Sequence, residues 1–382
     1  MKKILSFLLI FCMLFSMPVF ADEYKGYREI KVGLFFGSTA KDSVEIASAG
    51  GFNICFGEDK NFAYHYSMLE EAMTVTTAGD DDYNLGVNFT LTDGQIAIRP
   101  ARGVILVNGV PYRGFILLKR EANKPMTVIN VVDIESYLYS VVGKEMSPSW
   151  NIEALKAQAV CARTFVFKNL GKYKSYGFDL CTTQASQVYG GINAEYPSTI
   201  RAVDETAYKV IRYGGKACEV FYFSSSGGVT ESVENVWGTA FPHLKSVKDP
   251  YENPAEATKY TWDKTFTKEE IKEILEKKSV KIGDIIDVKV TQNAPSGRVV
   301  EITFIGTEGE YKALREKART ILSLSSQLYT ITPAEDGSSY LFEGGGWGHA
   351  VGMSQWGAKA MADQGFTYNE ILQFYFTDVE VE

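Results

Sequence analysis

One acidic residue stands where two predicted helices meet. Glu145 lies in the stretch 141–165, VVGKEMSPSWNIEALKAQAVCARTF, after a glycine and before a proline, so a short loop is predicted there. A carboxyl group that serves as a general acid must stay protonated near neutral pH, so its pKa must rise above about 4.3. Burial beside Met146 and Trp150 would raise this pKa, whereas the N-terminus of the next helix would lower it. The residues alone leave two interpretations open: an acid catalyst, or a simple cap of that helix.

Two cationic residues follow on the second predicted helix. Lys156 and Arg163 are seven residues apart, which is two helical turns, so their side chains should project from the same side. Such a pair would suit an anionic or polyhydroxylated substrate. The alternative is that both side chains run along apolar surface and place their charges in solvent.

A glycine-rich stretch near the end of the chain, GGGWGHAVGMSQWGAKAM at 344–361, predicts a loop that leads into a helix. It lacks the Gly-Lys-Ser/Thr of a phosphate-binding loop. Its indole side chains, Trp347 and Trp356, would pack well against sugar rings. His349 could donate a hydrogen bond to a ligand or belong to the core.

Other nucleophiles are disfavoured by the sequence. Ser224, Ser225 and Ser226 precede a Gly-Gly turn, but the chain has no GxSxG elbow and only three histidines. Cys161 falls in a helix that should be buried, where a thiol is inert. The absence of HExxH and CxxC motifs argues against a zinc peptidase and a cysteine-rich zinc module.

The whole chain fits an exported globular protein. It has 382 residues, 45% hydrophobic and 23% charged, and a net charge of -8, which argues against a nucleic-acid partner because that needs a clustered basic surface. Residues 1–21 combine two lysines, an apolar run and small residues, so we predict a signal peptide cleaved after Ala21. The alternative is an uncleaved anchor at the outer face of the membrane. The folded part is extracytoplasmic in either case, and its four remaining cysteines could form a disulfide.

The elements that must position these residues indicate an α+β fold. Short apolar segments predict a β-rich N-terminal region over 22–121, in which 67–73 could form a helix. A mixed domain over 122–382 begins with a helix at 133–143 and a longer, alanine-rich helix from about 150 to 170. We expect an α/β subdomain at 262–332. The expected pieces after the alanine-rich helix are strand-like segments at 186–191, 210–228 and 243–249, helices at 267–278 and 310–324, and a hairpin at 284–306. The chain should close with a glycine-rich loop and a helix within 343–365 and a last short helix at 367–376.

The motifs together resemble the stage II sporulation protein D/LytB family. The resemblance rests on DIESYLYSVVGKEMSPSWNIEALKAQAVCARTF, SQVYGG, FYFSSSGGVTESVENVWG, LKSVKDPYE, LREKARTILSLSSQLYTI and GWGHAVGMSQWGAKAMADQGFTYNEILQFYF, in the family's order. It implies peptidoglycan as the substrate. Catalytic members are lytic transglycosylases that cut the MurNAc–GlcNAc bond, and those of sporulation prefer strands stripped of peptides by an amidase. Other members are described as amidase enhancers, so an amidase is an implied partner.

The resemblance also implies roles for particular residues, and we expect no cofactor. Glu145 falls on the family's proposed acid, which would protonate the leaving oxygen and then accept a proton from the 6-hydroxyl that closes a 1,6-anhydro ring. Substrate contacts are implied for the residues that fall on other motif positions: Lys156, Arg163, Gln187, Tyr189, Tyr222, Ser224 and His349.

Two departures from the family keep alternatives open. Phe223 stands where many members have a histidine, and Cys181 lacks the histidine that completes a zinc site in some members, so no metal is expected. The alternative to an enzyme is a glycan-binding module that stimulates an amidase. A minor third hypothesis is metal-dependent peptide cleavage. The sequence does not decide between a role in sporulation and one in vegetative wall remodelling.

Overall fold

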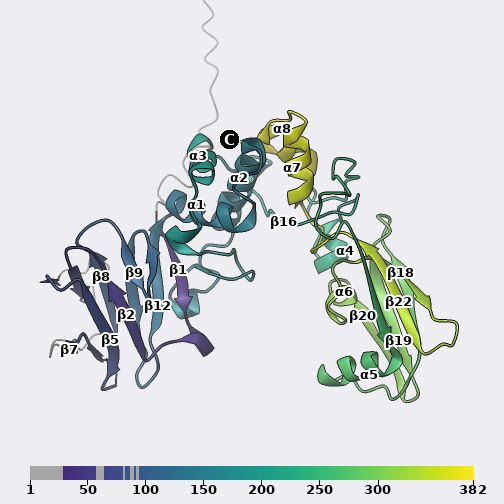
Figure 1. The fold of residues 1–382 in the computed structure, drawn as a ribbon, viewed down its shortest axis with the longest axis horizontal. Coiled ribbons are helices and arrows are strands. Elements are labelled where there is room, and N and C mark those ends of the chain that lie inside the picture. Colours follow the sequence, from purple (N-terminus) through teal and green to yellow (C-terminus); the bar gives the residue numbers. More distant parts are fainter. Residues whose placement is uncertain (1–28, 57–63, 81, 87–89, 92–93) are drawn as a thin grey trace, which may run out of the picture.

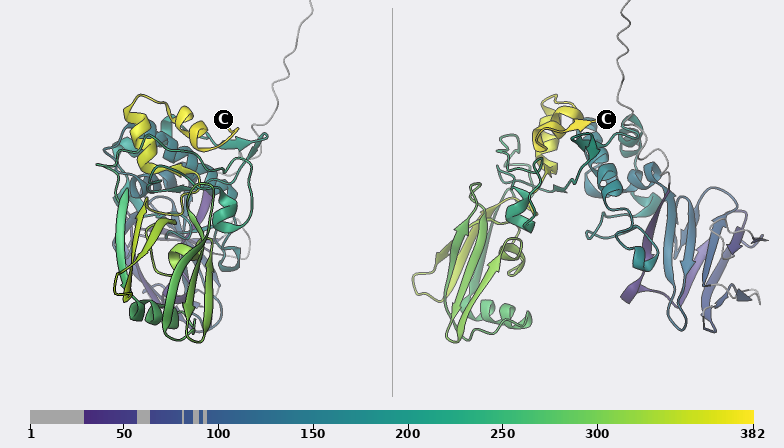
Figure 2. Two further views of the ribbon diagram at one scale, coloured as in Figure 1. Left: turned by 90° about the vertical axis from the view of Figure 1, so that its right-hand side faces the viewer. Right: turned by 180° about the vertical axis from the view of Figure 1, so that it is seen from behind.

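The computed structural model is an arch with two β-rich arms joined by a layer of helices (Figures 1 and 2). It describes residues 29–56, 64–80, 82–86, 90–91 and 94–382. The predicted signal peptide lies outside these residues. The predicted α+β class is confirmed, because helices and strands are both abundant and occupy separate layers. Among the described residues, no helix combines the length and the apolar character needed to cross a membrane.

The first arm is a sandwich of two sheets that share one core. Alternate residues such as Ile30 and Val32 of one sheet, and Val44 and Ile46 of the other, are buried between them, as expected for strands with one face inward. The seven-stranded sheet has the order β13 (Leu180–Cys181), β1 (Glu29–Phe35), β12 (Thr127–Asp133), β11 (Phe115–Lys119), β8 (Gln95–Pro100), β3 (Phe52–Phe56), β4 (Tyr64–Met68). The six-stranded sheet has the order β10 (Val110–Tyr112), β9 (Ile105–Val107), β2 (Ser43–Ala47), β5 (Ala72–Ala78), β6 (Asp82–Asn84), β7 (Thr90–Leu91).

The prediction of a possible helix at 67–73 is wrong. Met68 ends β4 and Met73 lies in β5, and both side chains are buried in the shared core. Leu69, in the connection between these strands, is 86% exposed. Burial of both methionines, on strands that belong to the two different sheets, outweighs the helical propensity of this short segment.

A layer of helices joins the two arms. Its members are α1 (Ile134–Glu145), α2 (Ile152–Lys168), α3 (Pro197–Glu205), α7 (Gln355–Asp363) and α8 (Tyr368–Tyr375). Two predicted helix starts are confirmed, since Asp133 accepts a hydrogen bond from the Ser136 N–H (3.1 Å) and Asn151 accepts one from the Glu153 N–H (3.1 Å). The fully buried alanines of α2 let α7 approach closely, so the end of the chain returns to its middle.

The first helix is longer than predicted. It was expected to stop at Gly143, but α1 continues to Glu145. A Cβ atom at residue 143 would lie 2.1 Å from the carbonyl oxygen of Ala194. Gly143 therefore allows a close approach between α1 and the neighbouring 3-10 turn (Gly191–Ala194), and it does not end the helix.

The second arm has its own core, which includes Phe266, Phe304 and Phe342. That core extends to β22 and so passes the expected boundary at residue 332. The predicted helix at 267–278 and the hairpin at 284–306 are confirmed, but 310–324 is not one helix, because its first half pairs with β19 as β20. The elements are β17 (Thr261–Thr267), α5 (Lys268–Lys277), β18 (Ile285–Asn293), β19 (Val299–Gly306), β20 (Gly309–Leu314), α6 (Lys317–Thr320), β21 (Leu328–Pro333) and β22 (Ser339–Gly345).

Short elements connect the second arm to the helices. The strand β16 (Tyr222–Phe223) pairs in parallel with β23 (Met353–Ser354), and β23 leads directly into α7. The remaining elements are β14 (Ile211–Tyr213), β15 (Lys216–Ala217), β24 (Glu380–Val381), α4 (Val233–Trp237) and two 3-10 turns (Gly37–Thr39, Lys174–Tyr176). The strand-like segments expected at 186–191 and 243–249 form no regular strand; Lys248 makes only an isolated bridge with Val229.

Candidate functional site

The carboxyl group of Glu145 is held by three other parts of the chain. The backbone N–H of Val188 donates to Glu145 Oε1 (3.2 Å), and the side chains of Tyr222 and Gln355 hydrogen-bond to the same carboxyl group. Tyr222 and Gln355 arrive together because β16 and β23 are paired, and Gln355 follows β23 as the first residue of α7. The site therefore depends on pairing between distant segments.

Burial dominates the electrostatics of this carboxyl group. Burial raises the pKa of Glu145, while the hydrogen bonds from Val188, Gln355 and Tyr222 lower it, and the net result is a pKa above the ordinary value. Among the described residues, no charged group contributes to the shift. The interpretation of Glu145 as a helix cap is wrong, because the cap of α2 is Asn151.

A chain of hydrogen bonds leads through the protein toward Glu145. Tyr137 donates its hydroxyl hydrogen to Gln187 Oε1 (3.2 Å), and Gln187 Nε2 donates to the Tyr222 hydroxyl (3.1 Å) and to the Ala162 carbonyl (3.3 Å). Burial raises the pKa of both tyrosines well above that of a free phenol. Because Tyr222 accepts from Gln187 and stays protonated, its own hydrogen is directed to Glu145.

Two glutamines at the site were missed in the sequence. Gln355 Nε2 donates to Gln158 Oε1 (3.4 Å), so Gln158 of α2 stands directly behind the residue that contacts Glu145. Both lie within the motifs that carried the resemblance, ALKAQA and GMSQWG. Neither carries charge, so nothing but that position in the motifs could have singled them out.

The structure places Lys156 and Arg163 away from Glu145. Arg163 is fully buried, and its guanidinium donates to both carboxylate oxygens of Glu135 (2.8 and 2.6 Å) and to the carbonyls of Lys209 and Val203. Lys156 pairs with Glu153 (2.8 Å) and with Glu205 of α3 (2.7 Å). Both side chains leave α2 on the same side, as the spacing predicts, but a turn of about 100° per residue puts that side opposite Gln158.

Tyr189 and Ser224 support the site through their neighbours. The Tyr189 side chain is buried, donates its hydroxyl to Asn130 Oδ1 (2.8 Å) and packs its ring 4.9 Å from that of Tyr137. The carbonyl of Ser224 accepts from the Trp356 N–H (3.0 Å). These contacts fix elements around Glu145, and neither side chain has a contact with the carboxyl group among the described interactions.

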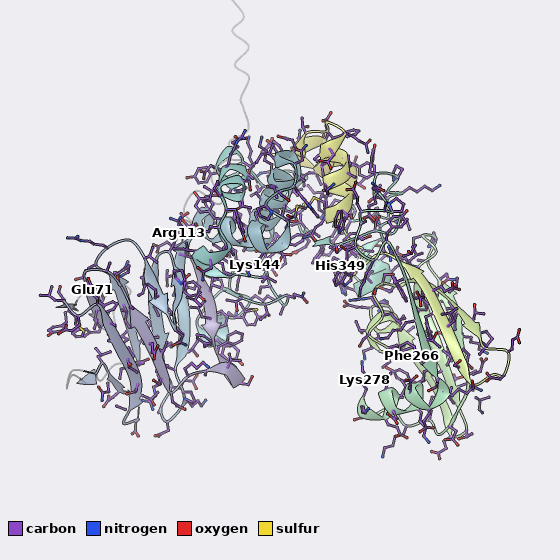
Figure 3. All side chains as sticks on the ribbon, in the orientation of Figure 1. Glu71, Arg113, Lys144, Phe266, Lys278 and His349 are labelled. Atoms are coloured by element: carbon purple, nitrogen blue, oxygen red, sulfur yellow. The ribbon has the colours of Figure 1, made fainter. Side chains whose placement is uncertain are left out.

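His349 supports the strand that carries Tyr222. Its Nδ1 accepts from the Val351 N–H (3.1 Å), and the ring hydrogen-bonds to the Tyr222 carbonyl, which makes Nε2 the donor. Burial and the nearby Arg319 lower the pKa of His349 to about 4, so the ring is neutral at neutral pH. Phe223 packs 5.5 Å from this ring, between centroids. Figure 3 shows His349 on one arm of the arch and Lys144, the residue before Glu145, on the inner side opposite.

The serines after β16 anchor a turn. Ser225 donates to Glu252 Oε2 (2.8 Å), Ser226 donates to Asp249 Oδ2 (3.0 Å), and the hydroxyl of Ser354 also donates to Glu252. All three hydroxyls are buried. They satisfy buried carboxylates, and no histidine is among the hydrogen-bond partners of these hydroxyls in the described part of the chain.

The surroundings of Cys181 do not fit a zinc site. Its sulfur lies 3.3 to 3.5 Å from the hydroxyls of Tyr173, Thr183 and Ser186. Burial raises the pKa of this thiol, but the hydrogen bonds outweigh burial and leave the pKa below its ordinary value. Among the described residues, no three His, Cys, Asp or Glu side chains are grouped to hold a metal, and the described cysteines are free thiols.

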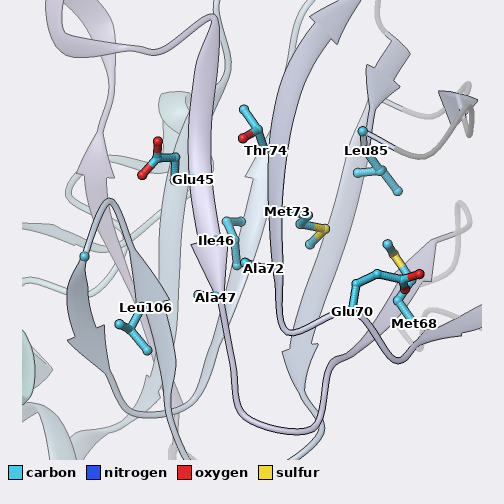
Figure 4. Close-up of a pocket in the computed structure, with 12 residues that line it drawn as sticks. Glu45, Ile46, Ala47, Met68, Glu70, Ala72, Met73, Thr74, Leu85 and Leu106 are labelled. Carbon is cyan, nitrogen blue, oxygen red and sulfur yellow. The ribbon is translucent and has the colours of Figure 1, made fainter.

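A surface pocket of about 560 Å³ lies in the first arm, on the six-stranded sheet. Figure 4 shows its two carboxylates, Glu45 and Glu70, at opposite ends of a lining that is otherwise mostly apolar. All of its lining residues belong to the first arm, and none of them is among the residues that hydrogen-bond to Glu145. The pocket therefore does not belong to the candidate site.

Comparisons with known proteins concern the segments that build this site. The chain matches the family model Stage II sporulation protein over residues 122–213, and the model Domain of unknown function (DUF8618) over residues 232–352. It is 32% identical over 266 residues to the stage II sporulation protein D of Bacillus subtilis, which covers 65% of this chain and 74% of that protein. It is 34% identical over 305 residues to an uncharacterized protein of Brachyspira hyodysenteriae, covering 78% and 77%. The amidase enhancer of Bacillus subtilis is 33% identical over 293 residues, covering 63% of this chain and 39% of that protein.

Proposed function

This chain belongs to the stage II sporulation protein D family, and from that premise we propose that it is an extracytoplasmic lytic transglycosylase of peptidoglycan. It cuts the MurNAc–GlcNAc bond of peptide-stripped glycan strands and leaves 1,6-anhydro ends, in sporulation or wall remodelling. The observation that carries the proposal is Glu145, a partly buried carboxyl group with a raised pKa that three hydrogen-bond donors hold. The predicted signal peptide supports the location outside the membrane, and the reaction needs no cofactor.

A lytic reaction can proceed with one carboxyl group, whereas hydrolysis usually needs two. Glycoside hydrolases usually place two carboxyl groups on opposite sides of the scissile bond, about 5 to 10 Å apart, so that one of them can activate water or attack the sugar. Among the described residues, no second carboxyl group contributes to the pKa of Glu145. An internal nucleophile, the 6-hydroxyl of the muramic acid, removes the need for a second one.

The three donors also determine where the acidic proton sits. A carboxyl group offers about four lone-pair positions. In the proposed arrangement the donors from Val188, Tyr222 and Gln355 take three of these positions and leave one for the acidic proton. The substrate would bind on the side of that remaining position.

The proposed reaction returns the enzyme to its starting state without water. Glu145 gives its proton to the glycosidic oxygen as the C1–O bond breaks, and the leaving sugar departs as an alcohol. The same three donors stabilise the resulting carboxylate. Glu145 then takes the proton of the 6-hydroxyl as O6 bonds to C1, which closes the anhydro ring and restores the acid.

A second candidate function is a glycan-binding stimulator of a cell-wall amidase. The relative named amidase enhancer favours it, together with Phe223 at a position where many family members have a histidine. In this reading Glu145 would contribute to binding and not to bond cleavage.

Mass spectrometry of glycan products separates the two candidates. Amidase-stripped peptidoglycan is incubated with wild type, with Glu145→Gln and with Glu276→Gln, an exposed carboxylate of the second arm that serves as the matched control. We expect anhydro-ended fragments from wild type and Glu276→Gln only. Equal activity of Glu145→Gln would refute its role as the acid. Binding without fragments, with amidase stimulation that survives Glu145→Gln, would establish the second candidate.

A further inference from the structure

The contact between Gln355 and Glu145 is built from two helices far apart in the sequence. Gln355 is the first residue of α7, whose start is fixed because Ser354 accepts from the Gly357 N–H (3.2 Å). Its side chain is almost fully buried and reaches the carboxyl group of Glu145. Gln158 lies on α2, is fully buried, and accepts from Gln355 Nε2.

The direction of the Gln355 amide decides what it does to Glu145. With its NH₂ group toward Glu145 it donates to the carboxylate, whereas a flipped amide would turn its carbonyl oxygen toward a negative charge. Gln158 Oε1 accepts from the same NH₂ group, so it favours the first direction.

By presenting its Oε1 to Gln355, Gln158 leaves its own NH₂ group without a hydrogen-bond acceptor among the described residues. Its own Nε2 is buried and has no hydrogen-bond partner in the part of the chain that the structure describes. A donor left unsatisfied in the interior costs about 1–3 kcal/mol, so such a group calls for an explanation. Presenting Oε1 to Gln355 supplies one.

We propose that Gln355, oriented by Gln158, is a positioning residue that stabilises the carboxylate of Glu145 and directs its proton to the substrate side. The inference rests on the proposed function for its role in catalysis. The hydrogen-bond arrangement itself can be tested on protein that has never met a substrate.

The other groups around Glu145 make the test simple. The titratable side chains that act on or respond to it are Tyr137 of α1 and Tyr222 of β16, and both stay protonated because burial raises their pKa. The segment before Tyr189 contributes only the Val188 N–H. Removing one donor therefore changes the pKa of Glu145 directly, since a hydrogen bond to the charged form lowers it.

Carbon-13 NMR of protein labelled at the glutamate carboxyl carbon measures this pKa, with Glu145→Gln to assign the resonance. We expect a higher titration midpoint in Gln355→Met than in wild type, and a smaller increase in Gln158→Met. The control is Gln364→Met, an exposed glutamine just after α7, which should titrate like wild type. Gln355→Asn, whose amide is one methylene too short, replaces Gln355→Met if the latter does not fold.

An unchanged midpoint in the Gln355 variants would overturn the inference, and an unchanged midpoint in Gln158→Met alone would overturn the orienting role. Loss of this donor should also lower kcat on stripped glycan by roughly 10²-fold, with little change in KM. If wild type releases no anhydro products, the proposed function fails, and the NMR midpoints still test the arrangement of the glutamines.

Discussion

Arg163 allows a direct test of whether a charged residue in a family motif contacts substrate or stabilises the fold. The resemblance implies that it contacts substrate, but its guanidinium is fully buried and bound to Glu135, whose side chain is 15% exposed. Arg163→Met removes the cation and leaves the carboxylate and two carbonyls without their donors. Breaking a buried ion pair in this way costs about 3–5 kcal/mol. With a urea dependence of about 3 kcal/mol per molar, the unfolding midpoint should fall by more than about 1 M.

Urea unfolding followed by tryptophan fluorescence measures the effect. Trp150 and Trp356, 4.7 Å apart between ring centroids, report on the helical layer, while Trp262 reports on the second arm, which has its own core and can unfold separately. The control is Lys156→Met, whose ion pairs are partly exposed and should contribute no more than about 1 kcal/mol. An Arg163→Met protein with an unchanged midpoint and no glycan turnover would refute this reasoning, because the guanidinium would then serve the substrate.

Two further predictions concern the hydrogen bonds and the pKa of the acid. Tyr222→Phe removes a hydrogen-bond donor to Glu145 and the acceptor of the Gln187 amide. The release of anhydro products should therefore fall roughly 10²-fold, while the circular dichroism spectrum stays unchanged. Wild-type turnover in this variant would exclude the contact from the mechanism. Burial raises the pKa of Glu145 above its unfolded value of about 4.3, so the folded state binds more protons between the two values and wild type loses stability as pH rises through the folded pKa. Glu145→Gln escapes this loss, and its melting temperature should therefore gain on wild type as pH rises; a difference that does not change with pH would contradict the raised pKa.

The parts of the fold that were predictable are those fixed by neighbours in sequence. Asp133 and Asn151 cap α1 and α2 through hydrogen bonds within three residues, so the sequence predicts both starts. The strand β20 was missed because its state depends on pairing with β19, which the local pattern of residues 310–324 does not contain. The end of α1 was misplaced because Gly143 faces Ala194, a contact that only the folded chain reveals.

The same limit applies to the candidate site. Glu145 stands out in the sequence as a carboxylate between two helices, but its donors come from segments that tertiary pairing brings together. Charge drew attention to Arg163, although charge equally suits a buried ion pair. Gln158 and Gln355 were not predicted as site residues, because the role of an amide side chain becomes clear only when its hydrogen-bond partner is known.

The second arm contacts the site through hydrogen bonds from Arg298 as well as through the chain connections at β16 and β23. It is inserted between β16 and β23, which pair across it and bring Tyr222 and Gln355 to Glu145. Arg298, in the loop between β18 and β19, donates to the carbonyls of Ser226 (2.5 Å) and Val229 (2.7 Å), in the turn that follows β16. We therefore expect a shift of the Arg298 loop to reach this turn, and through β16 the Tyr222 hydroxyl. Arg298→Met should then lower the release of anhydro products, measured by mass spectrometry, without touching the acid.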